Sequence, residues 1–418
     1  MDTVTDQANR PNRPNLTIPQ GILLTTLVLL SASGLLASDI NLPGMPLAAR
    51  ALDTPITALQ QTFSVYVIGL AVAQALYGAL SDTYGRRRLV IGGMTVYALA
   101  SIGCALAPNV ALFGLARVFQ ALGAGAGMVI GRAIIGDIFD AKRAARIFTT
   151  IMPIVGASPA LAPLVGGYLT DCVSWRAPFL LTAVLGVAAV VLMLVYIPET
   201  LPQARRQRSA SATFRNYPML LGQPRFWTYA LNLCVAYAAY LGYLAASPVI
   251  LDHMGLGPKA ASTCYISLSV TYICSNLVSR HFAGRYALDR LLGVGYAFFA
   301  LGAVCLVGVA LAGVNTPWPV FFAASIITLA NGFLVPLSFA GGVTSFPATA
   351  GAASGLMGAL HLAAGAAAIA TVAALPSTVS ALAAFVACVA AFGCVAFPLS
   401  LRLARQAEAV GAAACPSH

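Results

Sequence analysis

Charged side chains are scarce in this 418-residue chain, where Asp, Glu, Lys and Arg together make up 8% of the residues. A soluble domain carries about 25% of these residues, so this sequence cannot cover a water-facing surface of normal size. Hydrophobic residues account for 59% of the chain, and its mean hydropathy is +0.86. The composition therefore predicts a membrane protein.

Sequence motifs of enzymatic and metal chemistry are also missing. The four histidines form no cluster, and the nine cysteines stand singly, without the CxxC or Cys/His spacing of a metal site or disulfide framework. The sequence contains no P-loop and no nucleophile elbow. We therefore expect no metal site, no enzyme activity and no ATP-driven transport. A membrane sensor that transports nothing is a further alternative.

The net charge of +11 raises the question of nucleic-acid binding. The Lys and Arg residues lie in short clusters between apolar runs instead of along one face. This distribution is typical of loops beside an anionic lipid leaflet. We therefore expect the lipid bilayer as a partner, and no nucleic acid.

Twelve apolar segments are long enough to cross a bilayer core of about 30 Å, which takes about 20 helical residues. We predict an all-α integral membrane protein with twelve transmembrane helices in two six-helix bundles. The predicted spans lie near 20–42, 58–81, 88–107, 110–139, 146–169, 177–197, 225–249, 259–279, 290–313, 317–343, 351–375 and 378–402. The predicted domains are an N-terminal tail (1–19), a first bundle (20–197), a linker (198–224), a second bundle (225–402) and a C-terminal tail (403–418).

The first apolar run and the basic residues set the expected topology. The run 21–37 is longer than the apolar part of a signal peptide, usually about 7–15 residues, so we expect a retained first span. With the N-terminus in the cytoplasm, eighteen Lys and Arg residues fall on the inner side, and only Arg50, Arg176 and Lys259 fall outside. The positive-inside rule therefore predicts that both termini and the linker are cytoplasmic.

The segment GALSDTYGRRRL (78–89) joins the second and third predicted spans and combines two glycines with an Asp and three Arg residues. It resembles the loop signature of the major facilitator superfamily, G-x-L-a-D-r-x-G-r-r, although Thr83 replaces a basic residue. The resemblance implies the major facilitator fold and a loop that holds the outward-open state. A solvated positive-inside loop would explain the arginines but not the spacing. The implied latch residues are Gly78, Asp82, Gly85, Arg86 and Arg87.

The fourth predicted span contains ARVFQALGAGAGMVIGRAIIGDIF, with Arg117, Arg132 and Asp137. An Arg inside a membrane costs about 2.5–3.5 kcal/mol, so it should face a bundle interior, a cavity or a partner. The stretch resembles the R-x-x-Q-A-x-G form of the Bcr/CflA drug exporters within this superfamily. The resemblance implies that Arg132 and Asp137 join the latch charges; a place in the substrate site is the alternative.

The fifth predicted span contains GASPALAPLVGGYL (156–169). It is similar to the antiporter signature g-x-x-x-G-P-x-x-G-G of the superfamily, with Ser158 and Ala162 in place of two glycines. Proline kinks also occur in bundles that perform no antiport. The residues that carry the resemblance are Pro159, Pro163, Gly166 and Gly167.

The first predicted span ends in SDINLPGMP (38–46), which resembles the Bcr/CflA pattern D-x-x-x-P-x-x-P. Asp39 lies about four residues, or roughly 6 Å, from the outer end of its span, and Arg117 lies roughly 10 Å from the outer end of the fourth. These similar depths favour pairing of Asp39 with Arg117, although depth does not determine whether the two side chains face each other. We interpret them as the proton-coupling residues. An interfacial carboxylate solvated at the helix end is the alternative, although the helix dipole disfavours a carboxylate there.

Together, the resemblances imply a proton-coupled antiporter that exports small lipophilic antimicrobials across a bacterial inner membrane, as a monomer and without a cofactor. A facilitator or proton symporter for a metabolite is the alternative. Because span one has no second acid between residues 21 and 37, we favour neutral substrates such as phenicols or bicyclomycin-like compounds. We expect His361 to be a core residue instead of a proton relay. Candidate substrate contacts, each of which packing could also explain, are Ser31, Asn41, Tyr66, Gln120, Tyr237, Tyr240 and Asn331.

Overall fold

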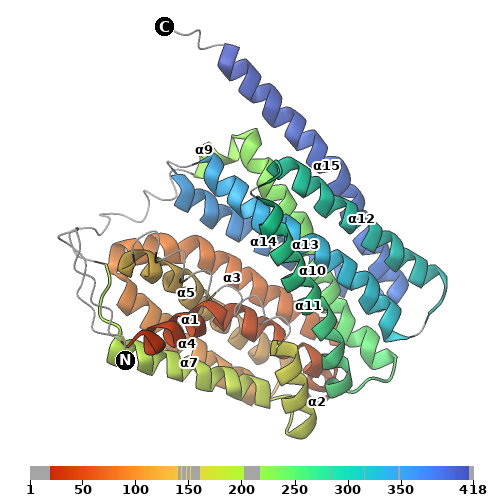
Figure 1. Cartoon of the computed structure of the whole chain (residues 1–418). Coiled ribbons are helices and arrows are strands. Elements are labelled where there is room, and N and C mark those ends of the chain that lie inside the picture. The colour runs from red at the N-terminus through yellow and green to blue at the C-terminus, as the bar shows by residue number, and fades with distance from the viewer. Residues whose placement is uncertain are drawn as a thin grey trace. The chain divides into compact units, whose positions relative to one another are not determined.

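The structure, a computed structural model, describes residues 19–139, 143, 147, 151, 161–201, 217–283, 285–314, 316–346 and 349–413. Its described elements are α-helices with one short 3-10 helix (Figure 1), which confirms the all-α prediction. In the N-terminal half these are α1 (Gln20–Asp39), η1 (Leu42–Gly44), α2 (Met45–Ala51), α3 (Ile56–Tyr84), α4 (Arg86–Leu106), α5 (Val110–Ile138) and α7 (Ala177–Tyr196). Residues 161–172 are also helical.

The C-terminal half begins with a short helix and continues with six long ones. They are α9 (Tyr217–Leu221), α10 (Pro224–His253), α11 (Pro258–Ala283), α12 (Leu288–Leu311), α13 (Pro317–Ser345), α14 (Ala350–Ala373) and α15 (Val379–Ala413). The chain divides into two compact units, Met1–Ala212 with Leu256–Thr263, and Thr213–Gly255 with Cys264–His418. The predicted domain boundaries remain predictions.

Within the described residues, ten helical segments are long and apolar enough to cross a membrane. Of the other two predicted spans, 146–169 lies mostly outside the described residues, and 259–279 corresponds to α11. Helix α11 is long enough, but its hydroxyl side chains lower its hydropathy. Five of these hydroxyls donate to carbonyls of their own helix, which makes them compatible with an apolar environment; they belong to Ser262, Thr263, Ser267, Thr271 and Ser275.

Each unit is built around one central helix. In the first unit, α5 packs against α1, α3 and α4, while α7 packs against α1 and α4. In the second unit, α10 packs against α13, α14 and α15. Large apolar side chains also cover outward faces, as with Leu106 (71% exposed) and Leu311 (84% exposed). This apolar exterior is suited to contact with lipid.

Candidate functional site

Helix α1 ends at Asp39, and the chain then turns through η1 into α2. The Asp39 side chain is buried, with only 3% of the residue exposed, and it accepts a hydrogen bond from Ser38. The carboxylate gains nothing from the helix dipole, because the C-terminal end of a helix carries partial negative charge. Stabilisation of the helix therefore does not explain why this carboxylate is buried.

The guanidinium of Arg117 lies in the core of the first unit, with no exposed surface. Its Nη1 donates to the carbonyl oxygen of Ala37 at 2.9 Å and to Oε1 of Gln120 at 2.7 Å. Its Cζ lies over the Tyr66 ring, 3.9 Å from the ring centroid, a cation–π contact. Among the described residues, Nε and Nη2 have no hydrogen-bond partner. A buried guanidinium with two unused donors is costly, so this side chain has capacity for a further acceptor.

Arg117 lies near the end of α1 that carries Asp39, and the two charges interact electrostatically over a distance longer than an ion pair. No ion pair within 4.0 Å joins Asp39 to any residue that the structure describes. Arg117 instead binds the backbone of Ala37, two residues before Asp39. The arrangement places an unpaired buried acid beside an incompletely paired buried base.

Gln120 connects Arg117 to two further helices. Its Nε2 donates to Oγ of Ser101 on α4 at 2.8 Å and to Oγ1 of Thr182 on α7 at 3.5 Å. The amide orientation is fixed, since its oxygen must accept from the guanidinium. Ser101 and Thr182 could not be predicted from the sequence, because one hydroxyl inside an apolar span does not indicate which neighbour it faces.

Side chains from three helices donate hydrogen bonds to backbone carbonyls of α1. The hydroxyl of Tyr66 on α3 binds the Gly34 oxygen at 2.8 Å, and that of Tyr97 on α4 reaches the Ser33 oxygen at 3.4 Å. Arg117 on α5 supplies the third donor. Because carbonyl oxygens have a second lone pair, α1 keeps its own helical bonds. The last two turns of α1 are therefore held by polar contacts as well as by packing.

Gly166 belongs to the helical stretch 161–172 and lies directly against the end of α1. A Cβ at Gly166 would overlap the carbonyl oxygen of Ile40, the residue after Asp39. Pro163 and Gly167 are buried in the same stretch. Pro159, the other residue of the antiporter resemblance, lies outside the described residues. The glycine allows the close approach that fixes the backbone beside Asp39.

A second charged cluster occupies the junction of α3 and α4. Arg86 forms an ion pair with Asp82 at 2.6 Å and another with Asp137 of α5 at 3.1 Å, and it also donates to Ser81. The turn between the helices depends on Gly85, whose φ of +94° is in the left-handed region that favours glycine. Asp82, Gly85, Arg86 and Asp137 thus meet in one network.

Glu199 and Arg87 cap each other's helices. The Glu199 carboxylate accepts from the backbone N–H groups of Arg86 (2.9 Å) and Arg87 (3.3 Å) at the start of α4. The Arg87 side chain donates to the carbonyls of Leu194 and Ile197, both at 2.8 Å, at the end of α7. Both contacts match the sign of the helix dipole. Glu199 is not among the predicted site residues, although an acid directly after a predicted span is a signal that could have indicated its role.

Of the two other predicted latch residues, Gly78 joins the network through its carbonyl oxygen, which accepts a hydrogen bond from Ser81 at 3.1 Å, whereas Arg132 has no contact with it among the described residues. Arg132 is exposed and donates to the Met128 carbonyl of its own helix at 3.0 Å. Gly78 has open space where a Cβ would stand. Their roles remain predictions.

The remaining predicted substrate contacts are spread over both units. Ser31, Asn41 and Asn331 are buried, and their side-chain oxygens have no hydrogen-bond partner among the described residues. In the second unit, the ring of Tyr237 lies 6.2 Å from that of Tyr240. Buried His361 lies 4.5 Å from the Tyr237 ring, and its Nδ1 is 3.1 Å from the Met357 carbonyl.

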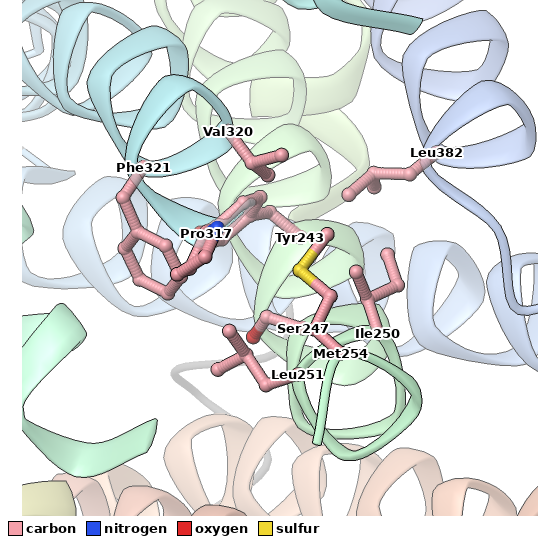
Figure 2. A pocket seen from close by; sticks show the side chains of 9 residues that line it. All are labelled: Tyr243, Ser247, Ile250, Leu251, Met254, Pro317, Val320, Phe321 and Leu382. Atoms are coloured by element: carbon pink, nitrogen blue, oxygen red, sulfur yellow. The ribbon is translucent and has the colours of Figure 1, made fainter. Parts of the chain in front are cut away.

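The second unit also contains a small apolar pocket between α10, α13 and α15 (Figure 2). The hydroxyl of Tyr243, one of its lining residues, is buried and has no hydrogen-bond partner in the described part of the chain. None of the predicted substrate contacts lines this pocket. Within the described part of the chain, no three His, Cys, Asp or Glu side chains lie close enough together to hold a metal ion. The pocket is lined by Tyr243, Ser247, Ile250, Leu251, Met254, Pro317, Val320, Phe321 and Leu382.

Comparison with known proteins agrees with this architecture. Multidrug resistance protein D of Escherichia coli (strain K12) is 29% identical over 342 residues, which cover 81% of this chain and 85% of the relative. The chloramphenicol resistance protein of Pseudomonas aeruginosa is 27% identical over 289 residues, 68% of each chain. The crystal structure of a mutant of the nucleoside transporter NupG has a similar fold, with a TM-score of 0.70 and 11% sequence identity. The match covers 91% of this chain and 98% of that one.

The family model described as Major Facilitator Superfamily matches residues 27–369. Together with the similar structure, this match confirms the predicted facilitator fold. The family and the sequence relatives confirm a role in transport instead of catalysis. The chain belongs to the major facilitator superfamily of multi-pass membrane transport proteins.

Proposed function

We propose that this chain is a proton-coupled antiporter that exports small, neutral, lipophilic antimicrobials of the phenicol or bicyclomycin type. The observation that carries the proposal is the buried carboxylate of Asp39, which has no ion-pair partner among the described residues and lies beside the buried guanidinium of Arg117. Two relatives whose names refer to multidrug and chloramphenicol resistance support the substrate class.

Asp39 carries the proton in this mechanism. Burial disfavours an ionised carboxylate, whereas a nearby guanidinium favours it. A small displacement of Arg117 between the Ala37 carbonyl and the Asp39 carboxylate would therefore change how readily Asp39 binds a proton. The two unused donors of Arg117 are available for that exchange. Substrate entry and proton release are coupled because both change the surroundings of the same acid.

The proton gradient supplies enough free energy for such export. One proton moving inward while a neutral drug moves outward transfers one charge, worth about 2.3 kcal/mol per 100 mV. A pH gradient adds about 1.4 kcal/mol per unit. A combined driving force near 200 mV supports a drug gradient of roughly a thousandfold. No cofactor is needed.

The second charged cluster serves as the conformational latch. Arg86 lies between the carboxylates of Asp82 and Asp137, and Arg87 and Glu199 tie the same turn to the end of α7. Breaking these contacts in one conformation and forming them in the other gives two discrete states, which alternating access requires. The inner location of this cluster follows from the predicted cytoplasmic termini. We further propose that the transporter acts as a monomer in the bacterial inner membrane.

Expression in a drug-sensitive bacterium, with a broad susceptibility panel, tests this function. We expect increased resistance to neutral lipophilic antimicrobials, which a protonophore abolishes by collapsing the gradient. Resistance restricted to permanently cationic compounds would contradict the neutral-substrate assignment. Uptake of a metabolite together with protons, without any resistance, would favour the alternative of a symporter.

A further inference from the structure

Five exposed arginines gather at one end of the second unit, where α11 ends and α12 begins beside α15. Arg280 is in the last turn of α11, and four residues separate α11 from α12. Nη2 of Arg405 on α15 lies 3.0 Å from Oδ2 of Asp289 in the first turn of α12. Helices α12 and α15 pack together (Figure 1). The cluster, called here the arginine corner, consists of Arg280, Arg285, Arg290, Arg402 and Arg405.

Positive charge is in excess at the arginine corner. Among the residues whose side chains the structure describes, Asp289 is the acid at this corner, and it forms an ion pair with Arg405. The other described acid of the unit, Asp252, is close to the opposite end of α10. No ion pair within the described part of the chain engages the other four arginines. They can therefore receive an anion without breaking a contact.

Exposed apolar side chains adjoin this charge. Leu399 (54% exposed) and Leu403 (50%) lie on α15 within one turn of Arg402, and Tyr286 (52%) lies in the connection between α11 and α12. An aromatic ring at the boundary between charged and apolar surface is typical of a membrane interface. The corner thus offers guanidinium donors beside an apolar strip, which matches a phosphate joined to acyl chains.

We propose that the arginine corner binds the headgroup of an anionic phospholipid, with an acyl chain along Leu399 and Leu403. Arg presents a planar fork of donors suited to phosphate oxygens. Anionic lipids are attracted to basic clusters at the cytoplasmic ends of transmembrane helices, where the predicted topology places this corner. Asp289 competes with the lipid for Arg405 and so limits the affinity.

Native mass spectrometry of the purified full chain, titrated with phosphatidylglycerol or phosphatidylcholine, measures this binding. We expect retention of phosphatidylglycerol but not of phosphatidylcholine. Arg290→Gln and Arg402→Gln should each weaken phosphatidylglycerol binding about fivefold. Asp289→Asn should strengthen it by a similar factor, because Arg405 is released. Weaker binding in the two arginine variants and stronger binding in Asp289→Asn would distinguish lipid binding at this site from a general loss of fold.

Arg176→Gln is the matched control, since it removes one positive charge from a loop that the topology prediction places on the outer side of the membrane, away from the cytoplasmic corner. It should leave phosphatidylglycerol binding unchanged. Equal binding of the two lipids, or no change in both Arg290→Gln and Asp289→Asn, would overturn the proposal and leave the arginines a role in topology only. Complete displacement of the lipid by inorganic phosphate would show an anion site instead of a lipid site.

Discussion

At the scale of single residues, Arg117 makes contacts that depend on the shape of its guanidinium as well as on its charge. Its Nη1 donates to two acceptors at once, the Ala37 carbonyl and Gln120, while its Cζ lies over the Tyr66 ring. These contacts depend on a flat, multidentate donor. A Lys ammonium is a compact point charge with three donors on a flexible stem, so it cannot reproduce this geometry.

We therefore predict that Arg117→Lys folds but loses about tenfold or more in transport, because at least one charged hydrogen bond worth about 1.5–3 kcal/mol is lost. The measurement is drug transport in membrane vesicles at equal expression. Arg176→Lys is the control, since Arg176 stacks on Trp175 and is more exposed. Full activity in Arg117→Lys would show that the planar fork is irrelevant.

At the scale of secondary structure, the approach between α1 and the stretch 161–172 sets the position of Asp39. A Cβ on Gly166 would overlap the Ile40 oxygen, whereas a Cβ on Gly92 of α4 would meet nothing within 4 Å. A backbone atom cannot rotate away as a flexible side chain can. The substitution must therefore push the two elements apart.

Gly166→Ala should lower stability by about 1–3 kcal/mol through overpacking and also reduce transport by displacing Asp39. Gly92→Ala should be neutral or slightly stabilising, because Ala favours helix over Gly by about 1 kcal/mol. Thermal melting in detergent, paired with vesicle transport, separates the two effects. A Gly166→Ala protein as stable and as active as the Gly92→Ala control would contradict this account of the approach.

How much the sequence predicts depends on the kind of signal. Helix positions follow from apolar length alone, so the predicted span 110–139 is close to α5 (Val110–Ile138). The charges of the two clusters are visible because acids and bases are rare in this chain. Their partners are less visible, since Gln120 reaching Ser101, or Glu199 reaching the start of α4, depends on how helices rotate and pack.

At the scale of the whole molecule, transport requires two conformations of similar free energy. The pairs of Arg86 with Asp82 and Asp137 have side chains that are only partly exposed, so they are screened less than surface pairs. Removing one charge should change the balance between the states without unfolding either. Substitutions of the latch residues therefore test the transport mechanism more than the stability of the fold.

Asp82→Asn should leave the protein folded and in the membrane but lower transport, because the turn loses a charge that biases one conformation. Efflux at equal expression is the measurement, and Asp53→Asn, at an exposed residue, is the control. If efflux is unchanged, Asp82 has no part in the mechanism.

The coupling of drug export to protons through Asp39 is the central claim, and transport by Asp39→Asn in proteoliposomes with an imposed pH gradient tests it most directly. Asn mimics the protonated carboxyl, so we predict that this variant still binds drug in a direct binding assay but no longer accumulates it against a gradient. Asp171→Asn, at an exposed acid, should pump normally. Uphill transport by Asp39→Asn in response to the pH gradient would contradict the account and make this carboxylate structural.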